Sequence, residues 1–361
     1  MRFSRISIYL LLALVSVACS STEQATQQQP IAGSAVSGSP SAINLLDKMP
    51  AADRGERQWI FAELVSTGPA GIQSLTNMLV PPGSGNDTQA RFAVNGLAKY
   101  VSQAGMESEQ IMFEDVLLKG LQSNYQPAVK GFLMEQLELI GSEQSIPVLK
   151  SFLGAENLHK SAVHALRSIN SQRAQQTLVQ ALTSTRGAKR SAIIKTLGDM
   201  QVTTAALDLL PFASSGDWPT QKAALYALAQ TGDPVAVEPL TAAVDEYGGY
   251  KSTVVENYYL LLAERLAAED HQEESAELSR NILSGEYSSH AKSAALAILF
   301  KNKGKVALDG LLDAAADSDE RMRHTALSIL KGHPELDIPE RWVNQFDRYS
   351  PAAQADIIAM L

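Results

Sequence analysis

A leucine that recurs every 31 residues constrains the fold of this chain more than any other feature. These anchor leucines are Leu166, Leu197 and Leu228, and then Leu299, Leu330 and Leu361. The residues three and four positions before each anchor are apolar, which gives one apolar stripe on a helix: Ala162 and Val163, Ile193 and Ile194, Ala224 and Leu225, Ala295 and Leu296, Ala326 and Leu327, Ile357 and Ile358. Each unit has room for two helices whose apolar face it cannot cover alone, so neighbouring units must stack. The pattern predicts an all-α solenoid of antiparallel helix pairs over residues 43–361.

The residue seven positions before each anchor is polar in every unit, and we expect it to lie outside. These residues are His159, Arg190, Gln221, Lys292, Arg323 and Gln354. Hydrophobic residues make up 45% of the chain and aromatic residues only 6%, which suits helix packing better than a β-sandwich. The interval from Leu228 to Leu299 is 71 residues, or 31 plus 40, and it holds one longer pair near 245–285.

Two earlier second helices are recognisable at residues 90–97 and 132–137. The glycines before the first of them do not form a phosphate-binding loop, because no strand precedes them and no Lys follows Gly85. Asp87 or Thr88 is instead predicted to cap a helix that begins near Gln89.

Residues 317–327 read Asp-Ser-Asp-Glu-Arg-Met-Arg-His-Thr-Ala-Leu, which resembles the Asp-x-Asp-x-x-Val-Arg-x-x-Ala signature of HEAT-like repeats of the PBS-lyase type. The turn at 231–234, Thr-Gly-Asp-Pro, is similar to the turn between repeats of that family. The resemblance implies a HEAT/armadillo-like superhelix, structural roles for the Asp and Arg positions, and a scaffold that binds other proteins.

The first residues are typical of an exported lipoprotein. Arg2 and Arg5 precede an apolar run at 6–17, and small Ala18 precedes Cys19, the only cysteine. The motif resembles the bacterial lipobox, which implies a signal peptide at 1–18 and a lipid on Cys19; ordinary cleavage after Ala18 is the alternative. Residues 19–42 form a flexible linker. Ser20, rather than Asp, follows Cys19, which resembles the signal for the outer membrane. We therefore expect the chain to be lipid-anchored to the outer membrane of a Gram-negative-type bacterium. The sequence does not indicate whether it faces the periplasm or the cell surface.

No motif indicates catalysis, a cofactor or a metal. The six histidines include no His-x-x-x-His pair, and Asp317 and Asp319 are explained by helix capping. A net charge of -9 disfavours nucleic acid as a partner. We therefore expect no enzymatic activity.

Four tyrosines of the irregular region are candidates for binding a partner: Tyr247, Tyr250, Tyr258 and Tyr259. Exposed tyrosines in a groove anchor partners well. The alternative is that they form a bulky packing layer where the array changes curvature.

The sequence favours an envelope scaffold that recruits a protein through a concave face lined by second helices. An alternative is an accessory arm of a carbohydrate hydrolase, because residues 44–92 resemble the N-terminal helical region of exported proteins that carry a keto-disaccharide hydrolase-like domain. Leu361 ends the chain within a second helix, so we expect the solenoid to be truncated and such a C-terminal domain to be missing. A third possibility is a spacer without a ligand.

Overall fold

The computed structural model describes residues 41–336, 344 and 346–360, and all regular structure in these residues is helical. The α-helices are α1 Ala42–Leu46, α2 Arg54–Ser66, α3 Gly68–Asn77, α4 Thr88–Val101, α5 Glu107–Gln122, α6 Pro127–Ile140, α7 Ile146–Lys150, α8 His159–Ile169, α9 Gln172–Ser184, α10 Gly187–Asp199, α11 Ala206–Ala213, α12 Trp218–Thr231, α13 Val237–Glu246, α14 Tyr250–Ala268, α15 Gln272–Ser284, α16 Ser289–Lys303, α17 Leu308–Ala315, α18 Glu320–Lys331 and α20 Pro351–Met360. Short 3-10 helices are η1 Glu143–Ser145, η2 Thr203–Ala205, η3 Pro234–Ala236, η4 Gly304–Ala307, η5 Pro334–Leu336 and η6 Phe346–Arg348. The predicted signal peptide, Cys19, the linker up to residue 40 and Leu361 lie outside the described residues.

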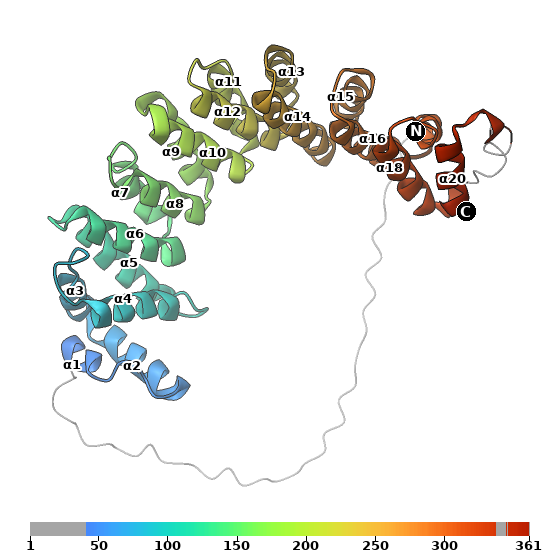
Figure 1. The fold of residues 1–361 in the computed structure, drawn as a ribbon. Coiled ribbons are helices and arrows are strands. Elements are labelled where there is room, and N and C mark those ends of the chain that lie inside the picture. The colour runs from blue at the N-terminus through green and yellow to red at the C-terminus, as the bar shows by residue number, and fades with distance from the viewer. Residues whose placement is uncertain (1–40, 337–343, 345, 361) are drawn as a thin grey trace, which may run out of the picture. The chain divides into compact units, whose positions relative to one another are not determined.

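The helices form successive pairs, which Figure 1 shows following one another in chain order. The even-numbered, second helices contact one another in sequence from α2 to α18, and α18 contacts α20. The first helices form the other layer, with contacts from α1 through α3, α5 and α7 to α9. The predicted all-α solenoid is confirmed.

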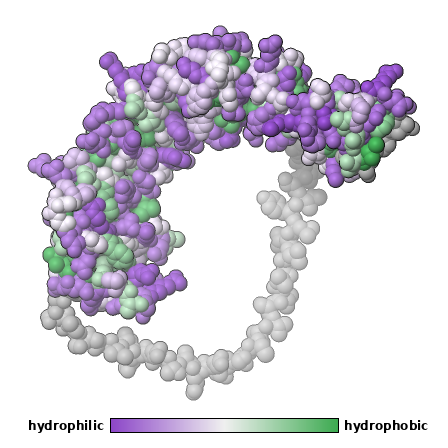
Figure 2. Space-filling model, viewed as in Figure 1, coloured by the Kyte–Doolittle hydropathy of each residue, from purple (hydrophilic) through white to green (hydrophobic). Residues whose placement is uncertain are grey.

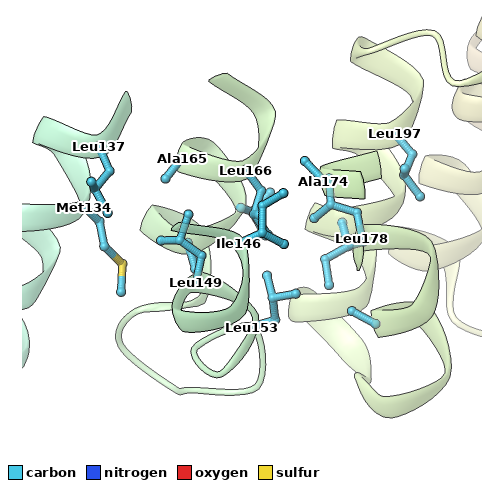
Figure 3. Packing of buried hydrophobic residues seen from close by; sticks show 14 of the residues in the cluster. Met134, Leu137, Ile146, Leu149, Leu153, Ala165, Leu166, Ala174, Leu178 and Leu197 are labelled. Atoms are coloured by element: carbon cyan, nitrogen blue, oxygen red, sulfur yellow. The ribbon is translucent and has the colours of Figure 1, made fainter. Parts of the chain in front are cut away.

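The apolar stripe is the core. Leu166, Leu197, Leu228 and Leu330 are buried, as are the apolar residues three and four positions before them. Figure 3 shows such residues from α6 to α10 filling the space between consecutive pairs. The expectation is wrong for Ile358, which is 63% exposed because no described residue packs over it, whereas its neighbour Ile357 is fully buried.

The polar residues seven positions before the anchors do not all lie outside. His159, Gln221 and Arg323 are buried. Seven residues are close to two helical turns, so this position lies only about 20° around the helix from the anchor and also faces the neighbouring pair. Arg323 donates through Nε to Asp356 at 2.8 Å, and Gln221 accepts from the Tyr247 hydroxyl group at 2.7 Å. These polar groups tie consecutive repeats together.

The long interval between Leu228 and Leu299 holds the pairs α13/α14 and α15/α16. Helix α14 is 19 residues long, which accounts for part of the extra length. The core also divides in this part of the chain. One apolar cluster runs from α1 to Ala295 on α16, and a second runs from Leu296 on the same helix to Ile357. Leu299 is only half-buried and packs against the second cluster.

Glycine and aspartate residues end and begin the helices as the family resemblance implies. Gly232 ends α12 in the left-handed region, with φ at 65°. Asp233 then caps η3, and Asp319 caps α18 by accepting from the backbone N–H groups of Arg321 and Met322. Helix α4 begins at Thr88, close to the predicted start, but Asp87 instead accepts from the backbone of Val80 and pairs with Arg91.

Most of the surface in the view of Figure 2 is hydrophilic, with apolar patches scattered among the repeats. Within the described ranges, no helix is long and apolar enough to cross a membrane.

Gly198 sets the spacing between two second helices, and its replacement tests that spacing. A Cβ atom there would lie 2.8 Å from the Cα of Ala227 on α12, so the neighbour is backbone that cannot rotate away. We expect Gly198→Ala to lower the free energy of unfolding by about 1–3 kcal/mol through overpacking. Urea midpoints followed by circular dichroism measure this.

The matched control is Gly310→Ala in α17, where nothing lies within 4 Å of the added atom. It should raise the stability by up to about 1 kcal/mol through helix propensity. Equal effects of the two substitutions would contradict the assignment of Gly198 as the contact between α10 and α12.

Candidate functional site

The four candidate tyrosines differ in exposure. Tyr250 is 70% exposed, Tyr247 and Tyr258 are half-buried, and Tyr259 is 1% exposed. The Tyr259 hydroxyl group lies 3.0 Å from Thr241 Oγ1, and its ring stacks on Tyr287. Burial raises the pKa of Tyr259, and it raises that of Tyr287 to about 12. Tyr259 is therefore a core residue, because a side chain without exposed surface cannot anchor a partner.

Trp218, Tyr247 and Lys251 form one half of the candidate site. Trp218 is the first residue of α12, and Tyr247 directly follows α13. Their rings meet edge to face with centroids 5.4 Å apart, and Lys251 Nζ lies 4.7 Å from both centroids. The hydrogen bond from Tyr247 to buried Gln221 fixes the ring. The two rings and the ammonium group are thus held in one arrangement.

The turn before α14 places Tyr250 outside the core. Gly249 adopts φ 62° directly before the helix, and an added Cβ atom would meet nothing within 4 Å, so backbone conformation alone favours glycine there. Tyr250 is then the first residue of α14, and Lys222 Nζ lies 5.9 Å from its ring centroid.

Tyr226 and Tyr258 form the other half of the site. The ring of Tyr226 on α12 lies 5.6 Å from that of Tyr258 on α14, and Lys195 Nζ on α10 lies 5.4 Å from the Tyr226 centroid. Burial raises the pKa of Tyr258. We call the whole set the aromatic surface: Trp218, Tyr226, Tyr247, Tyr250 and Tyr258 with Lys195, Lys222 and Lys251.

The sequence analysis did not identify Trp218, Tyr226 or the three lysines. A signal for two of them was present, because Lys195 and Tyr226 each stand two positions before an anchor leucine. Equivalent positions in consecutive repeats lie next to each other on the same layer.

Asp199 at the end of α10 joins the second helices beneath this surface. It accepts from the Tyr226 hydroxyl group at 2.9 Å and pairs with Lys195 at 2.8 Å, and Arg167 of α8 lies 3.8 Å away. Burial by itself raises the pKa of Asp199. Hydrogen bonds from Lys195 and Tyr226, with the charges of Lys195 and Arg167, outweigh that effect and hold the pKa below its usual value.

The aromatic surface is equipped for binding. It offers π faces and ammonium groups, which suit apolar and acidic side chains. In the part of the chain that the structure describes, no group of His, Cys, Asp and Glu residues could hold a metal ion.

Comparison with known proteins agrees with this architecture. Residues 114–191 and 176–257 match the model of HEAT repeats. A mutant of Kap121p is similar, with a TM-score of 0.51 and 12% identity over 85% of this chain and 38% of that chain. The Kap95:Nup1 complex is similar with a TM-score of 0.50 and 12% identity, over 88% of this chain and 50% of that chain. This chain thus spans half or less of those proteins, and the likeness shows the helical-repeat fold. No curated protein matches the chain.

Substitution of Asp199 tests its role as the link between the second helices. We expect Asp199→Asn to lower the free energy of unfolding at pH 7 by about 1–2 kcal/mol. This range already allows for the solvent exposure of Lys195, which weakens its ion pair with Asp199. Because the pKa of Asp199 is lowered in the folded state, this stabilisation is present above its ordinary value of 3.8 and is lost as the pH falls below it. Urea unfolding of both proteins measures the difference.

Asp115→Asn is the matched control, since Asp115 also pairs with a lysine four residues away but is 44% exposed. Its effect should stay within about 0.5 kcal/mol. An Asp199 variant no less stable than this control would refute the link.

Proposed function

We propose that this HEAT-repeat solenoid is a non-enzymatic scaffold that binds a protein partner through the aromatic surface. The observation that carries the proposal is Tyr250, which is 70% exposed, lies 5.9 Å from Lys222 Nζ and directly precedes Lys251, the lysine that contacts the Trp218 and Tyr247 rings. A HEAT-repeat fold is typical of protein–protein binding, and the similar Kap95 structure is a complex with Nup1.

The physical properties of these residues suit an interface. Tyr and Trp side chains bury a large area with few rotatable bonds, so they lose little entropy when a partner covers them. Four of the five rings are already packed against another ring or hydrogen-bonded, which reduces this loss further. The hydroxyl group of Tyr250 makes no hydrogen bond among the described residues, so it is available to a partner.

Photo-cross-linking tests the proposal. A photoreactive phenylalanine at position 250 of the whole chain should cross-link one defined protein in cells of the source organism. The same residue at position 207 is the control, because Leu207 is 69% exposed but lies on α11 in the layer of first helices. Tyr250→Ala should weaken binding of the identified protein at least about tenfold, as for an interface hot spot. Equal products from both positions, or none from 250, would exclude the aromatic surface as the contact.

We further propose that the scaffold is tethered to the outer membrane through a lipid on Cys19. The support is the arrangement of residues 1–19, with basic residues, an apolar run and a small residue before the single cysteine. Residues 20–41, which are rich in Ser, Gln and Gly, would act as the tether between the lipid and the repeats.

Labelling with radioactive palmitate tests the anchor. The wild-type chain should take up label and sediment with outer membranes, whereas Cys19→Ala should do neither because the thiol is the site of attachment. Ser20→Ala serves as the control and should behave as wild type. Unlabelled wild-type protein, cleaved after Ala18, would show ordinary secretion instead.

A further inference from the structure

A groove between the second helices α2 and α4 lies apart from the aromatic surface. Its volume is 460 Å³, within the range of about 300–1,000 Å³ that is common for ligand sites. Arg54, Arg57 and Phe61 line it from α2, and Phe92, Lys99 and Tyr100 line it from α4.

The floor of the groove depends on Gly96. A Cβ atom at this position would lie 2.0 Å from Phe61 Cζ, so the absence of a side chain lets the Phe61 ring lie against the backbone of α4. The Phe61 ring then stacks on Tyr100 with centroids 6.0 Å apart. Phe92 stands beside them and is 49% exposed. The groove therefore offers a fixed apolar floor and an exposed aromatic ring.

The charge of the groove is positive. Its lining includes Arg54, Arg57 and Lys99 and no carboxylate. Within the described ranges, none of the three cations forms an ion pair, although the chain as a whole carries a net charge of -9. Screening over about 8 Å at physiological salt separates these cations from the acidic residues of other repeats.

Two acidic residues, Asp53 and Glu56, are adjacent in sequence to Arg54 and Arg57, and both accept hydrogen bonds from backbone N–H groups. Asp53 accepts from the Glu56 N–H group, and Glu56 accepts from the Ala52 N–H group, so both carboxylates cap the start of α2. Arg54 is the first residue of α2, where the helix dipole favours anions over cations. The carboxylates of Asp53 and Glu56 therefore interact with the helix dipole and the backbone, whereas Arg54 forms no ion pair within the described ranges and is free to bind an anionic ligand.

We propose that this groove binds an acidic segment of a partner protein, with aspartate or glutamate side chains at the three cations and an apolar side chain at Phe92. The inference rests on the proposed scaffold function and adds a second contact with a defined chemistry. A peptide fits better than a nucleic acid strand, because the positive charge ends at the next second helix. There, α6 carries exposed Glu135 and half-buried Glu138, which would repel a continuing phosphate backbone.

Fluorescence anisotropy with the whole chain tests the inference. The probe is a short labelled peptide of aspartate and glutamate with one central phenylalanine, and its counterpart carries asparagine and glutamine in place of the acids. We expect the acidic peptide to bind at least about tenfold more tightly than its neutral counterpart. Arg57→Glu combined with Lys99→Glu should weaken its binding by about tenfold or more, and Phe92→Ala should weaken it severalfold.

The matched control reverses two exposed cations that lie outside both the groove and the aromatic surface, Lys160→Glu on α8 with Arg173→Glu on α9. It changes the net charge equally and should leave peptide binding unchanged. All the substituted groove residues are exposed, so circular dichroism should show an intact fold.

Three results would overturn the inference: equal binding of the neutral peptide, equal losses in both double variants, or displacement of the acidic peptide by single-stranded oligonucleotide at similar concentration. Each leaves the cross-link at position 250 unaffected, so the inference and the proposed function fail separately.

Discussion

The burial of each apolar stripe against the next helix pair is the interaction on which the whole structure depends. The two helices of a pair pack on each other, but the apolar stripe extends beyond that contact and is covered by the neighbouring pairs, so the stability of each repeat depends on its neighbours. Small residues allow these contacts to be close: Gly198 brings the backbone of α10 to that of α12, and Gly96 does the same for the Phe61 ring and α4. These close contacts set the distance between neighbouring second helices, and that distance decides which side chains of this layer lie next to each other.

Polar contacts between repeats fix the orientation of one helix pair relative to the next. Apolar stripes alone permit small rotations of one pair on the next, whereas hydrogen bonds hold one geometry. Asp199 links α8, α10 and α12, Gln221 links α12 to the end of α13, and Arg323 links α18 to α20. Asp199 and Gln221 also hold the rings of Tyr226 and Tyr247 in place, so two of the residues that link the repeats also order the aromatic surface.

The two candidate binding regions arise where the repeat departs from regularity. Around α14, the longer helix and the two glycines before it bring Tyr250 to the surface. Near the N-terminal end, a glycine within α4 opens the groove beside three cations that have no carboxylate partner among the described residues.

The sequence by itself determined that the chain is helical, that its repeat is about 31 residues long and that four of the anchor leucines are buried, because helix periodicity and the repeat interval are local properties of the chain. The longer interval between Leu228 and Leu299 also indicated where the repeat is irregular. Only the tertiary structure decided which polar residues are inside, since His159, Gln221 and Arg323 are buried by their partners in space. It likewise separated exposed Tyr250 from buried Tyr259, and it brought Arg57 and Lys99, which are 42 positions apart in the sequence, to one groove. Exposure and proximity depend on which neighbour covers a side chain, and that is settled only when the pairs stack.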